Sequence, residues 1–103
     1  MKHKDSVLVT TSYHPKPGLE KQFVRLWNKK LCKLSYESGV TVAGIYHNED
    51  TDEFIASSLW PNKELVEKFL NSLKCQQAID EVNKLCLIPA SRGVFEILKE
   101  AAA

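Results

Sequence analysis

Long apolar runs and an excess of one charge sign are both missing from this sequence of 103 residues. No apolar stretch approaches the ~20 residues that a helix needs to cross a bilayer. Fourteen Lys and Arg residues against thirteen Asp and Glu leave a net charge of +1, and Lys and Glu alternate without forming a basic stripe. We therefore expect neither nucleic acid nor a membrane as a partner.

Cysteine is also scarce, and its spacing does not suit a metal site. Cys32, Cys75 and Cys86 form no CxxC pair and leave one residue over in any disulfide pairing. An odd number of cysteines without a disulfide framework is typical of proteins of the reducing cytoplasm. The opening residues MKHKDSVLV are too poor in apolar residues for a secretion signal. The chain has no HxxxH spacing and no glycine-rich phosphate loop, so we expect no metal and no cofactor.

The composition that remains is that of an ordinary globular protein, with 44% hydrophobic and 26% charged residues. The length suits one domain over residues 1–103, with a core at about 7–98. Apolar periodicity predicts strands at VLVTTSY, VTVAGIYH, EFIASSLW and GVFEIL, a helix from Leu19 to near Gly39, and a helix after Asn62 that continues beyond Ser72. This β-α-β-β-α-β order predicts an α+β, ferredoxin-like fold: a four-stranded antiparallel sheet with helices on one face.

Each helix is expected to present one apolar face to the sheet. In the first helix, Leu31 falls at the edge of the apolar face, and Lys30 lies within that face. Lys30 is then either a lysine that snorkels its charge to solvent or a cation inside a cavity. The apolar face of the first helix consists of Leu19, Phe23, Leu26, Trp27 and Leu34. The second helix presents Leu65, Val66, Phe69 and Leu73, followed in its continuation by Cys75, Ile79, Val82 and Cys86.

The polar segment HNEDTDE, from His47 to Glu53, allows two interpretations: a metal-binding loop or a turn between two strands. A calcium loop of the EF-hand type needs a glycine at its sixth position and a glutamate at its twelfth. Counting from Asn48 or Asp50 places Glu53 or Ile55 sixth and Leu59 or Pro61 twelfth. We therefore expect a solvated hairpin turn.

The strands carry apolar side chains on both faces, since Val7 and Val9 alternate with Leu8, and Val94 with Phe95. Two helices can cover only one face of a four-stranded sheet. The other face would expose a larger apolar patch than is usual for a monomer. A symmetric homodimer joined sheet to sheet is the expected solution.

The chain resembles the antibiotic-biosynthesis monooxygenase domain family, a branch of the dimeric α+β barrels. The resemblance rests on YHPKPGLEKQF, on SGVTVAGIYHNEDTDEFIASSLWPNKELVEKFLNS and on GVFEIL, and it extends from about Val7 to Leu98. It implies two subunits whose sheets form a barrel, with a small cavity between sheet and helices in each. Members oxidise aromatic polyketides or quinols without metal or flavin, a haem-degrading branch binds haem, and others isomerise small metabolites or have no known activity.

Few functional positions of the family carry over. Phe69 stands at the position where many members have a histidine. Leu73 and Lys74 stand at the place where many members have a second histidine. The haem-degrading branch uses an asparagine, a tryptophan and a histidine. This chain has Thr11, Phe69 and Ile79 at those three positions, and these differences argue against haem degradation. Trp60 does match the family tryptophan, either as a core anchor or as a surface on which a substrate stacks.

A cofactor-free oxygenase needs a base, donors for the substrate anion and a site that excludes water. His3, His14 and His47 are the available histidines, and each is expected in a terminus or loop. Tyr13 shares a strand face with Thr11 and could donate to an oxyanion. Lys30 and Lys74 are candidates for holding an anion. Cys75 and Cys86 are expected to pack as small apolar residues.

The sequence thus favours a cofactor-independent monooxygenase-like protein acting on a small aromatic or quinol-type molecule. The alternative is a non-catalytic dimer that binds a small apolar ligand or has a structural role. No catalytic residue is identified. The candidates for lining a substrate cavity are Thr11, Tyr13, Trp60, Phe69 and Lys74.

Overall fold

The structure, a computed structural model, describes residues 5–98, so His3 lies outside the described part. The elements are β1 (Val7–Tyr13), α1 (Glu20–Trp27), the π-helical η1 (Asn28–Cys32), α2 (Lys33–Glu37), β2 (Val42–His47), β3 (Phe54–Trp60), α3 (Lys63–Asn71), α4 (Leu73–Asn83) and β4 (Ser91–Glu96). The expected order and α+β class are confirmed. The fourth strand begins two residues earlier than predicted, and the second helix is divided into α3 and α4.

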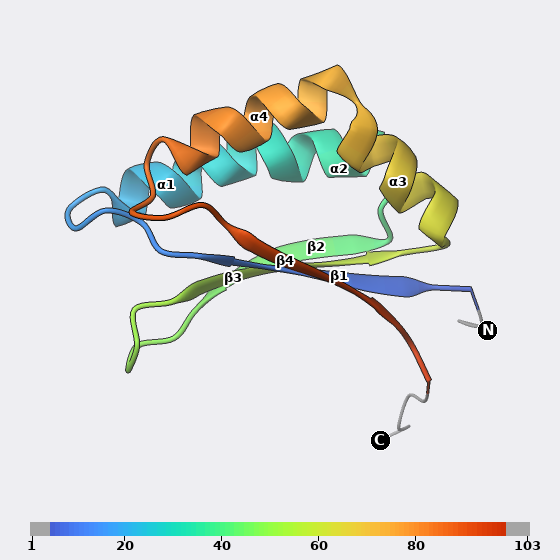
Figure 1. Cartoon of the computed structure of the whole chain (residues 1–103), viewed down its shortest axis with the longest axis horizontal. Helices are drawn as coiled ribbons and strands as arrows, with labels where there is room; N and C mark the ends of the chain where they lie inside the picture. Colours follow the sequence, from blue (N-terminus) through green and yellow to red (C-terminus); the bar gives the residue numbers. More distant parts are fainter. Residues whose placement is uncertain (1–4, 99–103) are drawn as a thin grey trace.

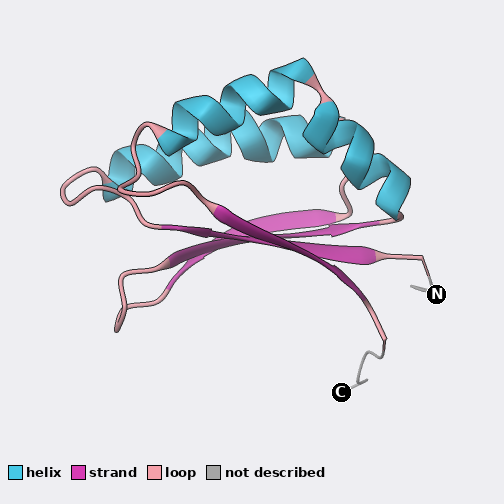
Figure 2. Ribbon diagram, viewed as in Figure 1, coloured by secondary structure: helices cyan, strands magenta, loops and turns pink. Residues whose placement is uncertain are grey.

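The four strands form one antiparallel sheet in the order β2-β3-β1-β4. Val7 pairs with Trp60 of β3 and with Glu96 of β4, so β1 lies between these two strands. The helices all cover one face of the sheet, and within the described part of the chain the opposite face carries none (Figure 1 and Figure 2). Among residues 5–98, no helix is long and apolar enough to cross a membrane.

The first helical segment is interrupted by the π-helical turn η1, which rotates its buried face. Phe23, Trp27, Leu31 and Ser35 are buried at regular four-residue spacing. In a regular α-helix, residues four apart drift around the helix axis, so Leu31 and Ser35 would turn away from the sheet. The i→i+5 hydrogen bonding of η1 turns the chain through a smaller angle per residue and keeps Leu31 and Ser35 facing the sheet. Leu31 is therefore central rather than at the edge, and Lys30 is exposed.

Two polar side chains begin the helices of the second helical segment, as the sequence predicts. Asn62 Oδ1 accepts a hydrogen bond from the Leu65 amide at 2.9 Å, and Ser72 Oγ accepts one from the Cys75 amide at 3.1 Å. Such N-caps satisfy amides that have no partner within the helix. Because Ser72 starts a new helix axis, Leu73 does not continue the apolar face of α3; it is 69% exposed.

The segment HNEDTDE forms a hairpin loop between β2 and β3. Asn48 Oδ1 accepts a hydrogen bond from the Asp50 amide at 3.0 Å, and His47 Nε2 lies 2.9 Å from Asp52 Oδ1. Asp52 has φ 60°, a conformation that Asp tolerates in tight turns. Local side-chain contacts thus account for the polar residues of this loop.

The sheet face away from the helices is apolar and exposed. Val42, Tyr46, Ile55 and Phe95 are all exposed there, and Tyr46 reaches 62%. At Gly44 of β2 the pairing with β3 is regular. The Tyr46 hydroxyl lies over it, 2.7 Å from the place of a Cβ atom, so Gly44 is a point of close approach.

Candidate functional site

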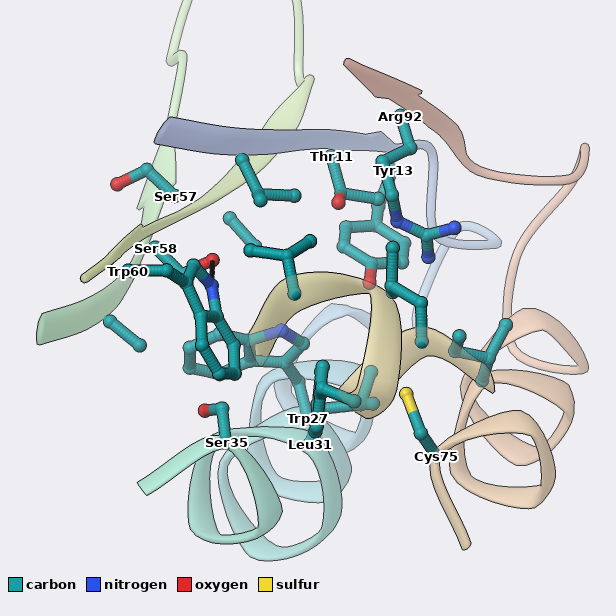
Figure 3. Close-up of a pocket in the computed structure, with 17 residues that line it drawn as sticks. Thr11, Tyr13, Trp27, Leu31, Ser35, Ser57, Ser58, Trp60, Cys75 and Arg92 are labelled. Carbon is teal, nitrogen blue, oxygen red and sulfur yellow. Dashed lines mark hydrogen bonds between the residues drawn. The ribbon is translucent and has the colours of Figure 1, made fainter. Parts of the chain in front are cut away.

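A cavity lies between the sheet and the helices, with a volume of about 50 Å³. Figure 3 shows side chains from β1, β3 and β4 converging with side chains from the helical layer. Its lining includes Val9, Thr11, Tyr13, Trp27, Leu31, Ser35, Ala43, Ala56, Ser58, Trp60, Val66, Phe69, Leu70, Cys75, Ile79 and Arg92. A space of this size holds a few water molecules.

Most of the cavity wall is apolar and aromatic. The rings of Trp60 and Phe69 lie with their centroids 5.0 Å apart at an interplanar angle of 37°. Trp60 is 1% exposed, and its Nε1 donates a hydrogen bond to Ser58 Oγ at 2.8 Å. Trp60 is therefore both a core anchor at the end of β3 and part of the cavity wall.

The polar wall is formed by neighbouring residues of β1 and β4. Thr11 and Tyr13 are buried on the helix-facing side of β1. Arg92 pairs directly with Thr11 in the β1–β4 register, so its side chain leaves the sheet on the same side. Figure 3 shows the guanidinium group beside the Tyr13 ring.

Burial raises the pKa of two side chains that line the cavity, Tyr13 and Cys75. Desolvation raises the pKa of Tyr13 to about 12, although the Arg92 charge opposes the shift. Desolvation likewise raises the pKa of Cys75 to about 11, again against Arg92. Both groups are therefore protonated at neutral pH and can donate hydrogen bonds, but neither can serve as a base there.

Four of the five cavity candidates line this space: Thr11, Tyr13, Trp60 and Phe69 do, whereas Lys74 does not. Lys74 precedes the buried Cys75 by one residue, or about 100° around α4, and it points outward. His14 and His47 are likewise outside the lining. Lys30 is exposed and lies 3.8 Å from Glu81 in an ion pair, so it is not a cation within the cavity.

Sequence reasoning missed Arg92. The predicted fourth strand began at Gly93, which left Arg92 in a loop with no assigned face. A strand beginning at Ser91 would have placed Arg92 on the same face as Val94. Alternation alone could have found it, had the start of the strand been recognised.

The cysteines are free thiols: Cys75 and Cys86 are buried and Cys32 is partly buried. Cys75 and Cys86 belong to the main apolar cluster, together with Phe23, Phe54 and Val82. Burial also raises the pKa of Cys86 and Cys32, so no thiolate is favoured. Among residues 5–98, no group of three or more His, Cys, Asp or Glu side chains is arranged to hold a metal ion.

No protein-family profile and no curated protein sequence matches the chain. Solved structures do match its fold. Rv0793 from Mycobacterium tuberculosis aligns at a TM-score of 0.80 with 18% identity, over 95% of this chain and 100% of that one. SnoaB from Streptomyces nogalater, a cofactor-independent oxygenase, aligns at 0.79 with 12% identity, over 93% and 96%. An antibiotic biosynthesis monooxygenase aligns at 0.76 with 11% identity, over 90% and 99%.

The chain thus has the fold of the antibiotic-biosynthesis monooxygenases, as the sequence resemblance implied.

Proposed function

We propose that the cavity binds a small aromatic molecule with an acidic hydroxyl or enol group, and that the protein is a cofactor-independent monooxygenase acting on the anion of that molecule. The observation that carries this proposal is the position of Arg92, with Tyr13 and Thr11, on one wall of a mostly apolar cavity. The fold shared with a cofactor-independent oxygenase supports it.

Each part of the wall has a role in this proposal. The Arg92 guanidinium supplies the counter-charge to a phenolate or enolate, and the Tyr13 hydroxyl donates a hydrogen bond to the same oxygen. Trp60 and Phe69 provide aromatic surface for the ring. Most of the remaining lining is apolar, which strengthens the charge interaction on the cavity side, whereas Arg92 is itself exposed and solvent screens part of its charge.

The reaction uses the electrons of the substrate anion to reduce dioxygen. An anthrone gains one oxygen atom as a new carbonyl group, while the second oxygen atom leaves as water with the two displaced hydrogens. A hydroquinone would instead give the quinone and hydrogen peroxide. Neither Tyr13 nor Cys75 can accept the first proton at neutral pH, so the favoured substrates ionise easily or do so under the influence of Arg92.

The cavity must widen before an aromatic ring can enter. A dry protein cavity that accepts benzene has a volume of roughly 150 Å³, whereas this one has about 50 Å³. Phe69 and Leu70 lie on α3. The helix breaks at Ser72, between the end of α3 and the start of α4. Movement of α3 relative to α4 is the simplest way to enlarge the space.

Oxygen consumption with a panel of anthrones and hydroquinones tests the proposal. We expect turnover by the parent protein that falls by at least tenfold in Arg92→Gln, because hydrogen bonds to charged groups are worth ~1.5–3 kcal/mol. Arg25→Gln removes the same charge from α1, outside the cavity, and should leave the rate unchanged. Equal rates in the parent and Arg92→Gln would overturn the assignment of Arg92.

The alternative is a non-catalytic protein that binds a small ligand in the same cavity. The observation in its favour is that no side chain lining the cavity is a base at neutral pH. Ligand binding that quenches Trp27 and Trp60 fluorescence, without oxygen consumption by any member of the panel, would favour this function.

We further propose that the chain is a cytoplasmic homodimer. The exposed apolar sheet face, with Val42, Tyr46, Ile55 and Phe95, supports pairing with a second copy. The free thiols of Cys32, Cys75 and Cys86 suit a reducing compartment.

A further inference from the structure

A groove with a volume of about 360 Å³ lies on the helical layer, separate from the cavity described above. One wall comes from η1 and α2, and the other from α4, which packs against η1. The groove is lined by Lys29, Lys30, Lys33, Leu34, Glu37, Lys74, Gln77, Ala78 and Glu81.

The charge of this groove is strongly positive for so small a surface. Four lysines face two glutamates, a balance of +2, whereas the whole chain carries +1. Glu81 is engaged by Lys30, with 3.8 Å between Oε2 and Nζ. Glu37 is then the one carboxylate of the groove lining left to balance Lys29, Lys33 and Lys74.

Two features of the helices add to the positive potential. The first turn of α4, which contains Lys74, has no acidic residue, so the partial positive charge of this helix end is not offset there. Lys29 and Lys33 are four residues apart across the π-helical turn, and both line the same groove. The lysines of both walls therefore act on one open groove.

The floor of the groove is apolar. Ala78 is buried and Leu34 is partly buried, and both belong to the core packing of the helical layer. A ligand that fits must present several negative charges to the walls and can rest an uncharged portion on this floor. A compact phosphate-bearing molecule has this chemistry.

We propose that the groove between η1, α2 and α4 is a binding site for a small polyphosphate or organic phosphate. An extended nucleic acid would need a longer continuous path of basic residues than the four lysines of this groove provide. The site is independent of the oxygenase cavity, because its lysines point away from the sheet and none of them lines that cavity.

Titration with inorganic pyrophosphate at low ionic strength, followed by amide NMR shifts, tests this site. We expect saturable shifts confined to residues 28–37 and 73–81, with no change at Thr11 or Trp60. The double variant Lys33→Gln/Lys74→Gln should bind at least about fivefold more weakly, and Lys33→Arg/Lys74→Arg should retain binding, because each exposed charge contributes modestly.

A matched double variant, Lys63→Gln/Lys68→Gln, removes two exposed lysines from α3 and should bind pyrophosphate as the parent does. An equal loss of affinity in both Gln double variants would show only a general effect of net charge and would overturn the proposal. Shifts that never saturate, or that spread over the whole surface, would overturn it as well.

Discussion

Arg92 of β4 pairs directly with Thr11 of β1, on the side of the sheet that the helices cover. This pairing brings a permanent cation to a cavity in which Tyr13 and Cys75 are held in their neutral forms. The cavity can therefore stabilise an anion, but it has no group that removes a proton at neutral pH.

Replacing Phe69 by histidine should raise oxidase activity. Phe69 lines the cavity beside Trp60 and offers no proton acceptor. A histidine there would supply general-base assistance, which is typically worth ~10²–10⁴-fold. The measurement is oxygen consumption with anthrones and hydroquinones at neutral pH, comparing the parent with Phe69→His.

The matched control is Phe69→Leu, which also removes the aromatic ring but adds no base. It should not show the gain. Fast turnover by the parent that is indifferent to Phe69→His would place the proton transfer elsewhere in the molecule.

The apolar sheet face should hold two chains together. Light scattering at micromolar concentration is expected to give twice the chain mass of 11.7 kDa. Phe95→Glu should shift the protein toward monomer, because it places a charge on the exposed sheet face, where Phe95 is 52% exposed. Leu87→Glu alters an exposed apolar residue in the loop before β4 and should not change the mass. A folded parent with the mass of a single chain would refute this arrangement.

The hairpin loop should tolerate the loss of its charges. The double variant Asp50→Asn/Asp52→Asn removes two charges but introduces asparagine, which suits tight turns as aspartate does. Both positions are exposed. We expect the free energy of unfolding to change by no more than about 0.5 kcal/mol, as at surface positions generally. Urea unfolding with and without calcium measures this. Stabilisation of the parent by calcium that is absent from the double variant would reveal a metal site in HNEDTDE.

Tyr13 should make the fold sensitive to alkali. Its pKa is about 12 in the folded state against 10.0 for an ordinary tyrosine. A group whose pKa is raised by folding adds stability that is complete below the unfolded-state pKa and is lost as the pH rises through the folded-state value. Between pH 8 and pH 11, the linkage relation gives a loss on the order of 1 kcal/mol from this one residue.

Urea unfolding of the parent and of Tyr13→Phe over this pH range measures that loss. Tyr13→Phe should lose less stability than the parent by about this amount. Identical pH profiles for the parent and Tyr13→Phe would show that the Tyr13 hydroxyl is not held neutral by burial.

The sequence by itself determined the elements whose signals are local. Val7–Tyr13 and Phe54–Trp60 are strands as predicted, because β-branched and aromatic residues alternate there between turn residues. Asn62 and Ser72 begin helices, because their side chains bond amides only three residues away. Thr11 and Tyr13 share a face, because strand side chains alternate.

The tertiary structure decided what depends on partners distant in the sequence. Arg92 reaches the cavity because β4 pairs with β1; alternation could have assigned its face, but the pairing that sets Arg92 beside Thr11 depends on residues distant in the sequence. Leu31 is buried and Lys30 is exposed because the π-helical turn rotates the helix, which an ideal 3.6-residue period does not anticipate. Lys74 points away from the cavity because the break at Ser72 sets α4 on a new axis, with Cys75 turned inward. Packing between the layers also sets the cavity volume, since it depends on how side chains from nine separate elements fill one space.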